Sequence, residues 1–153
     1  GALSVWEKNK MKEKHQDTFS DAVNDVPKVF PALMQAQKVA KRVEKGGWGY
    51  ADYESAEQKL FEEISELKAA RDTGDKKEIA SELGDVLMSA VNLGREVGAD
   101  CEEALLDTVK KIKRRFTAYE SAVLADGKDV NALSDEEKDR YYRAVKSAEE
   151  SGA

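Results

Sequence analysis

The chain has 153 residues, 37% of them charged, and a formal net charge of −6. This length is typical of one domain that buries a real hydrophobic core, and the acidic balance argues against a general nucleic-acid binder, because phosphate contacts need a basic face. With only 2 prolines and 10 glycines among abundant charged residues, the composition favours an all-α protein.

The single cysteine, Cys101, cannot form a disulfide within the chain, so a reducing compartment fits best. The sequence contains neither a signal-peptide pattern nor an apolar run long enough to span a bilayer. We therefore expect a cytoplasmic protein with no membrane partner.

We expect one domain over residues 1–153, with a polar, weakly patterned segment at 1–26, a core at 27–124 and a C-terminal helix within 125–153. The first core helix is predicted from about Pro31 to Lys45, because proline suits a first helical turn. Gly46 and Gly47 are expected to end it.

The next two helices are predicted at about 55–71 and 75–97. Ser55 with Gln58, and Asp75 with Glu78, have the spacing of capping boxes. From Leu83 to Leu93 the second of these helices is apolar nearly all round, a pattern typical of a buried helix.

A fourth helix is predicted at about 100–124 and a last one after Ser134, which Glu137 would cap. The fourth carries a heptad-like seam of apolar residues. The seam comprises Leu105, Val109, Ile112, Phe116, Tyr119 and Val123. The prediction is an all-α helical bundle of about four to five helices. It is expected to be completed by dimerisation, because the third helix and the seam expose more apolar surface than one short chain easily covers.

Acidic residues recur one helical turn apart on the second and third predicted helices. They are Glu62, Glu63 and Glu66 on the second, and Glu82 and Asp85 on the third. Residues at i and i+3 share a helix face, and a short turn makes the two helices antiparallel. Carboxylates that converge in this way repel one another unless a cation lies among them. The pattern predicts a divalent-metal site.

An all-oxygen site suits Mg2+ or Mn2+. A redox iron site on helices needs Glu-x-x-His, and the only histidine, His15, is far from either acidic segment. Lys59, together with Lys111 and Arg115, would place positive charge nearby, which fits a polyphosphate-bearing ligand.

Structural interpretations stay open for the same residues. Glutamates at i and i+3 are usually solvated, and Glu82 and Asp85 would also suit ion pairs with lysines. The basic run over residues 110–115 is best interpreted as solvated helix surface.

Several segments match a known family in order and spacing. They are Trp6-Glu7, residues 26–34, residues 59–67, Glu82-Leu83-Gly84-Asp85, Val91-Asn92-Leu93, residues 111–116 and residues 142–146. Together they resemble the MazG family of nucleoside triphosphate pyrophosphohydrolases, in particular the C-terminal module of its two-module bacterial members.

The resemblance implies an all-α, usually dimeric fold and Mg2+-dependent cleavage of a nucleoside triphosphate to a monophosphate and pyrophosphate. It assigns Mg2+ binding to Glu63, Glu66, Glu82 and Asp85. It assigns catalytic roles to Glu62 and Glu63, with Glu62 orienting the attacking water or binding a further ion. It assigns nucleotide contacts to Lys59, Glu62, Lys111, Arg115 and Tyr142.

Three positions depart from the family pattern. Val109 replaces a common asparagine, and Glu78 and Ser81 stand where some relatives have a lysine and a further glutamate. These departures motivate an alternative, a catalytically silent nucleotide-binding or protein-interaction helical bundle. A third interpretation is a purely structural helical domain.

Overall fold

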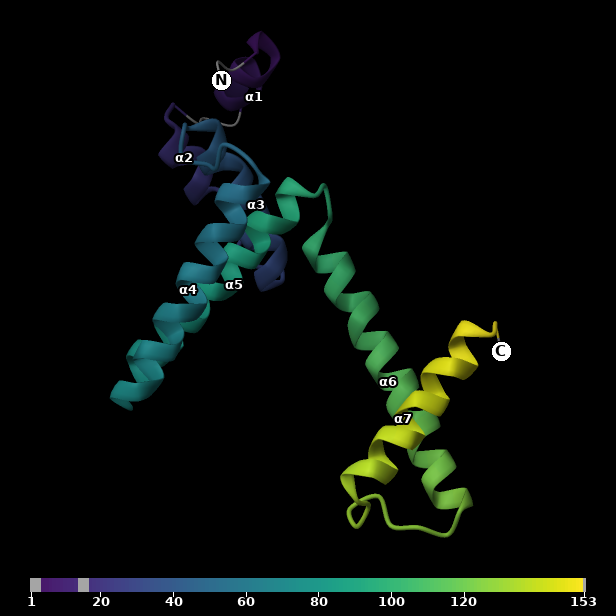
Figure 1. The fold of residues 1–153 in the computed structure, drawn as a ribbon. Coiled ribbons are helices and arrows are strands. Elements are labelled where there is room, and N and C mark those ends of the chain that lie inside the picture. Colours follow the sequence, from purple (N-terminus) through teal and green to yellow (C-terminus); the bar gives the residue numbers. More distant parts are fainter. Residues whose placement is uncertain (1–3, 14–16, 153) are drawn as a thin grey trace. The chain divides into compact units, whose positions relative to one another are not determined.

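Helices make up all the regular structure of the residues that the computed structural model describes, 4–13 and 17–152 (Figure 1). They are α1 (Val5–Glu13), α2 (Phe19–Asn24), α3 (Ala32–Lys45), α4 (Tyr53–Thr73), α5 (Lys76–Glu96), α6 (Cys101–Ala125) and α7 (Asp135–Glu150). The all-α prediction is confirmed, and these seven helices exceed the predicted four to five. None of the described helices combines the length and apolar character needed to cross a membrane.

The two additional helices lie in the segment predicted to be weakly patterned. α2 begins at a capping box in which the Thr18 hydroxyl accepts a hydrogen bond from the Asp21 amide, and the Asp21 carboxylate accepts one from the Thr18 amide. Thr18 and Asp21 have the spacing of a capping box, but aspartate replaces the usual glutamate as its second member, so the signal in the sequence is weaker. α1 buries none of its residues, so it leaves little apolar periodicity to detect.

Turn residues fix α3 and the start of α4. α3 begins after Pro31 and ends at Gly46, and Gly47 has a φ of +90°, as predicted from the prolines and glycines. α4 begins earlier than expected, because the Asp52 carboxylate accepts a hydrogen bond from the Ser55 amide at 2.8 Å. The predicted capping box at Ser55 is therefore wrong, since an aspartate three residues earlier is the N-cap.

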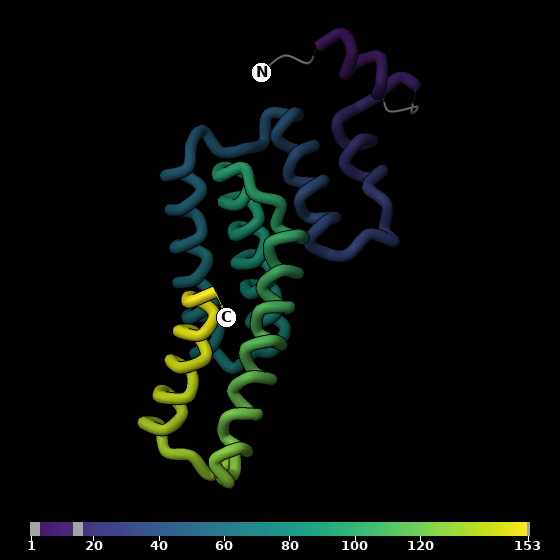
Figure 2. The backbone as a smooth tube through the Cα atoms, turned by 90° about the vertical axis from the view of Figure 1, so that its right-hand side faces the viewer, coloured from purple at the N-terminus to yellow at the C-terminus, as the bar shows by residue number. Residues whose placement is uncertain are grey.

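α4 and α5 form an antiparallel hairpin and lie side by side (Figures 1 and 2). Gly74, with a φ of +73°, ends α4 in the left-handed conformation that glycine adopts without strain. The Asp75 carboxylate then accepts hydrogen bonds from the amides of Lys77 and Glu78, which starts α5. This turn places the acidic segments of the two helices opposite each other.

The chain divides into two units, residues 1–102 and 103–153. In the first, α3 packs on α5 and α2 on α3, and the buried apolar residues are small: Ala22, Val26, Ala40, Ala56, Ala70 and Val91. α5 is less buried than predicted, with Leu83 45% and Leu87 54% exposed. A hairpin of two helices covers only one side of each, so an apolar circumference does not ensure burial within one chain.

The second unit pairs α6 with α7 around buried Val123, Tyr141 and Val145. The Tyr119 and Tyr141 rings meet edge to face with centroids 6.2 Å apart. The predicted capping box at Ser134 and Glu137 is present. Only the C-terminal end of the heptad-like seam is buried, since Leu105, Val109, Ile112 and Phe116 are all exposed.

An ion pair at the start of α7 gives a pH-dependent contribution to stability. The Lys128 ammonium, 2.8 Å from the Glu137 carboxylate, and the Ser134 amide hold the pKa of Glu137 at about 2, below its ordinary 4.5. A lowered folded-state pKa stabilises the fold above about pH 4.5, and this stabilisation is lost as the pH falls towards 2.

We expect Glu137→Gln to melt slightly lower than the parent protein at pH 7, because a partly exposed ion pair contributes little. The difference should disappear towards pH 2. Thermal melts followed by circular dichroism would measure it, with Glu136→Gln as the control that leaves this pair intact. A difference that does not change with pH would contradict the assignment.

Candidate metal and nucleotide site

Three of the predicted carboxylates converge between the two helices of the hairpin. Glu63 and Glu66 come from α4 and Glu82 from α5, and one carboxylate oxygen from each lies within 4.8 Å of the others. We call these three residues the carboxylate cluster. The convergence inferred from the i, i+3 spacing and the turn at Gly74 is confirmed for these three residues.

Two oxygens of the carboxylate cluster are buried without a partner among the described residues. Glu63 is only 5% exposed. Its Oε1 receives a hydrogen bond from the Lys59 ammonium at 2.8 Å, but its Oε2, like Oε2 of Glu82, has no hydrogen-bond partner. A buried carboxylate oxygen left in this way is costly. A bound cation would satisfy both, so the residues fit a divalent metal ion with oxygen ligands.

The electrostatics of Glu82 point the same way. Burial raises its pKa, and the nearby negative charges of Glu66 and Asp85 raise it further. Negative charge is therefore unfavourable at this position unless a proton or a metal cation offsets it. A lysine partner would lower the pKa of this carboxyl instead, so the raised pKa argues against the ion-pair interpretation of Glu82.

Asp85 and Glu62 lie at the edge of the carboxylate cluster. Asp85 follows Glu82 by one helical turn on α5 and is exposed; it acts on Glu82 through its charge but is not one of the three convergent residues. Glu62 is also exposed, and its carboxylate lies 3.9 Å from the Lys59 ammonium. Their predicted roles as metal ligand and water-orienting group stay predictions.

Lys59 is engaged with the carboxylate cluster. Its hydrogen bond to Glu63 raises the pKa of the lysine, and the Glu63 charge adds to this. The ammonium is thus held in its charged form beside the buried carboxylate. The prediction placed Lys59 on phosphate, whereas the structure pairs it with Glu63.

The remaining predicted nucleotide-binding residues belong to the second unit. Arg115 pairs with Glu149 at 2.8 Å and lies 3.5 Å from the Tyr142 hydroxyl. The pairing with Glu149 raises the pKa of Arg115. Lys111 lies one turn before Arg115 on α6 and is half-buried. The structure therefore brings Arg115 and Tyr142 together.

Glu149 was missed by the sequence reasoning. Besides Arg115, it accepts a hydrogen bond from Arg114 at 3.1 Å. Because 34 residues separate Glu149 from Arg115, no helical spacing could reveal the pair. The predicted solvated surface over residues 110–115 therefore includes two arginines that join α6 to α7.

The arrangement has a defined chemical capacity. The carboxylate cluster supplies oxygen ligands and unpaired negative charge, which suits a hard divalent cation such as Mg2+. Lys59 adds one positive charge beside the carboxylate cluster. The predicted phosphate contacts of Lys59, Lys111 and Arg115 stay predictions.

Comparison with known proteins identifies the family. Residues 51–118 match the MazG nucleotide pyrophosphohydrolase domain. The chain is 34% identical over 149 residues to the nucleoside triphosphate pyrophosphohydrolase of Escherichia coli K12, covering 96% of the chain and 57% of that protein. It is 32% identical over 145 residues to the nucleoside triphosphate pyrophosphohydrolase/pyrophosphatase MazG of Thermotoga maritima, covering 95% and 55%.

A third relative is the uncharacterized protein YabN of Bacillus subtilis, 31% identical over 148 residues, which cover 96% of the chain and 30% of that protein. The chain thus spans little more than half the length of the two pyrophosphohydrolases. The similarity nevertheless runs along nearly all of the chain and includes both acidic segments. The chain is therefore a MazG-domain homologue of these nucleoside triphosphate pyrophosphohydrolases, with about one residue in three identical along nearly its whole length.

Proposed function

We propose that this protein hydrolyses nucleoside triphosphates to nucleoside monophosphates and pyrophosphate with Mg2+, or Mn2+ in its place. The observation that carries the proposal is the pair of buried, unpartnered oxygens on Glu63 and Glu82 within the carboxylate cluster. A purely structural helix pair would gain nothing from leaving two buried carboxylate oxygens unsatisfied. Homology to these MazG-domain pyrophosphohydrolases supplies the reaction class.

Glu63, Glu66 and Glu82, with Asp85 beside them, would hold the metal ion. A cation held there would supply positive charge to offset that of the phosphates and to favour in-line attack by water. The water oxygen bonds to the α-phosphorus as the bond from that phosphorus to the bridging oxygen breaks, and pyrophosphate leaves.

The other predicted residues would contact the attacking water or the substrate directly. Glu62, exposed beside the carboxylate cluster, would orient the attacking water and accept its proton. Lys59, Lys111 and Arg115 would bind the phosphates and favour departure of pyrophosphate. Tyr142 would stack on the base. One domain over residues 1–153, in the cytoplasm, is part of the same proposal, and the family match over 51–118 supports it by crossing the boundary between the two units.

Product analysis tests the reaction. The protein is incubated with Mg2+ and a panel of ribo- and deoxyribonucleoside triphosphates, and the products are separated. Monophosphate with pyrophosphate is the expected result, and the ranking of rates would identify the preferred base and sugar. Diphosphate with phosphate would contradict the proposed bond cleavage. Binding of Mg2+-nucleotide without any product would favour the catalytically silent bundle instead.

Dimerisation is a second part of the proposal. Phe61 and Ile64 on α4, and Leu83 and Leu87 on α5, are each between 45% and 55% exposed. A hairpin that exposes this much apolar surface is a candidate for pairing with a second copy. Light scattering at micromolar concentration should give twice the 17.0 kDa chain mass, and Leu87→Glu should reduce it. A monomeric mass for the parent protein would contradict the proposal.

A further inference from the structure

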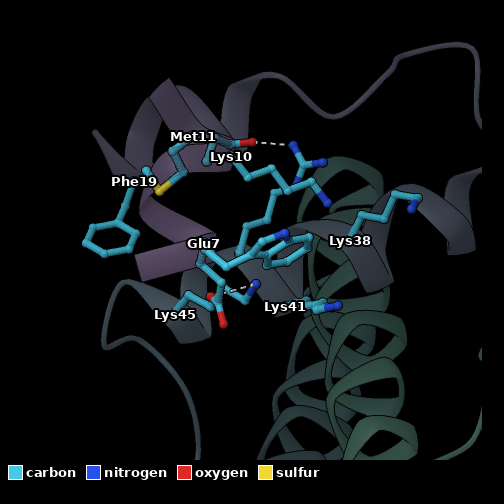
Figure 3. A pocket seen from close by; sticks show the side chains of 10 residues that line it. Glu7, Lys10, Met11, Phe19, Lys38, Lys41 and Lys45 are labelled. Carbon is cyan, nitrogen blue, oxygen red and sulfur yellow. Dashed lines mark hydrogen bonds and ion pairs between the residues drawn. The ribbon is translucent and has the colours of Figure 1, made fainter. Parts of the chain in front are cut away.

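A cavity lies within the first unit, between α1, α2 and α3. Its volume is about 260 Å3. Its lining includes Glu7 and Lys10 of α1 and Lys38, Lys41 and Lys45 of α3 (Figure 3). All of its lining residues precede residues 51–118, the segment that matches the MazG domain.

The lining is strongly basic in an acidic chain. Five of the lining residues are lysine or arginine and one is glutamate. Lys45 pairs with that glutamate, Glu7, at 3.1 Å, and the Arg42 guanidinium donates a hydrogen bond to the carbonyl of Ala22. Within residues 4–13 and 17–152, the other three lysines form no ion pair; they are Lys10, Lys38 and Lys41. The Lys38 ammonium lies 5.5 Å from the centre of the Phe30 ring, outside the cavity lining. The excess of positive charge around the cavity favours an anion.

The same cavity has an aromatic wall. Trp6 is 68% exposed, and the Lys10 ammonium lies 5.0 Å from the centre of its ring. Phe19 and Met11 complete the apolar side. An exposed indole beside lysine side chains offers a flat surface for a ring together with charge for a phosphate. Neither an inorganic anion nor a plain apolar ligand would use both.

We propose that this cavity is a second, non-catalytic site that binds a nucleoside phosphate, with the phosphates on Lys38 and Lys41 and the base against Trp6. Its volume of about 260 Å3 is just below the usual range for small-molecule sites, which begins at about 300 Å3, so a ligand no larger than a nucleotide is expected. A polynucleotide needs a groove that follows several successive phosphates. The inference does not rest on the proposed hydrolysis, because binding here needs neither a metal ion nor turnover.

Tryptophan fluorescence tests the proposal. The chain has two tryptophans, so Trp48→Phe leaves Trp6 as the only reporter. AMP, ADP and ATP are titrated in EDTA, without metal. Saturable quenching below about 1 mM is expected, within the usual range for metabolite sites. Adenosine and inorganic pyrophosphate should each bind more weakly than the nucleotides, because each engages only one side of the cavity.

Paired variants distinguish binding at this cavity from a general effect of the protein's positive charges. In the Trp48→Phe background, Lys38→Ala/Lys41→Ala should weaken nucleotide binding by about tenfold or more, as expected for lost charged contacts. Lys68→Ala/Lys76→Ala removes the same charge from exposed positions elsewhere in the unit and should have no effect. By calorimetry, Trp6→Ala should weaken binding and Trp48→Ala should not.

Four results would overturn the proposal. The first is no quenching up to about 1 mM. The second is an equal loss in both double-lysine variants. The third is pyrophosphate binding as tightly as ATP, which would mean a phosphate site without base recognition. The fourth is much tighter binding of a single-stranded oligonucleotide, which would make the surface a nucleic-acid site.

Discussion

Replacing Glu63 with glutamine is expected to lower pyrophosphate release by at least about a hundredfold, the loss seen when one electrostatic contact to a reacting centre is removed. Glu63 combines burial, an unpartnered oxygen and convergence with Glu66 and Glu82. The amide keeps the size of the side chain but removes a negative ligand atom. It also removes the nearer of the two carboxylates that pair with the Lys59 ammonium, leaving Glu62 at 3.9 Å.

The measurement is turnover of the preferred nucleoside triphosphate with saturating Mg2+, alongside far-ultraviolet circular dichroism to show that the helices persist. Glu96→Gln, an exposed carboxylate in the last turn of α5, is the matched control and should keep full activity. Asp85→Asn should also lose activity if its predicted role holds. Full turnover in Glu63→Gln would remove the carboxylate cluster from the mechanism.

Mg2+ is expected to raise the melting temperature of the protein. A ligand at a hundred times its dissociation constant stabilises the folded state by about 2.7 kcal/mol, which corresponds to roughly 5–10 °C for a chain of this size. The physical source is relief of the repulsion that now raises the pKa of Glu82. Differential scanning calorimetry with and without MgCl2 would measure the shift.

The control for this shift is NaCl at matched ionic strength, which screens charge but does not enter a carboxylate site. Glu82→Gln should raise the melting temperature of the metal-free protein, because one of the mutually repelling carboxylates becomes neutral. It should also reduce the further gain from Mg2+. An identical melting temperature in both salts would instead favour a purely structural domain.

Local signals in the sequence were sufficient where a single residue type decides the backbone. Pro31 and Gly46 fixed the ends of α3, and Ser134 with Glu137 fixed the start of α7. The proximity of Glu63 and Glu82 was also predicted from spacing, because the short turn at Gly74 makes α4 and α5 antiparallel neighbours.

The features that the sequence did not predict depend on competition between nearby residues for one hydrogen bond, or on residues distant in the sequence. Ser55 resembled an N-cap, but its own amide donates a hydrogen bond to the Asp52 carboxylate, which makes Asp52 the N-cap. Leu83 and Leu87 were expected to be buried because helical periodicity reports how apolar a face is, not whether the chain has another element to cover it. The pairing of Arg115 with Glu149 joins two helices whose register no local pattern encodes.

The Lys59–Glu63 ion pair has a consequence for the order in which ligands arrive. The ammonium occupies one oxygen of the buried carboxylate and so acts as a resident counter-ion while no metal is bound. A divalent cation that takes over this carboxylate frees the lysine, and a freed ammonium is then available to phosphate. Metal and nucleotide would thus bind with positive coupling, each raising the affinity for the other by the same factor. Replacement of the Lys59 ammonium by the metal ion at Glu63 would thus couple metal binding to nucleotide binding through Lys59.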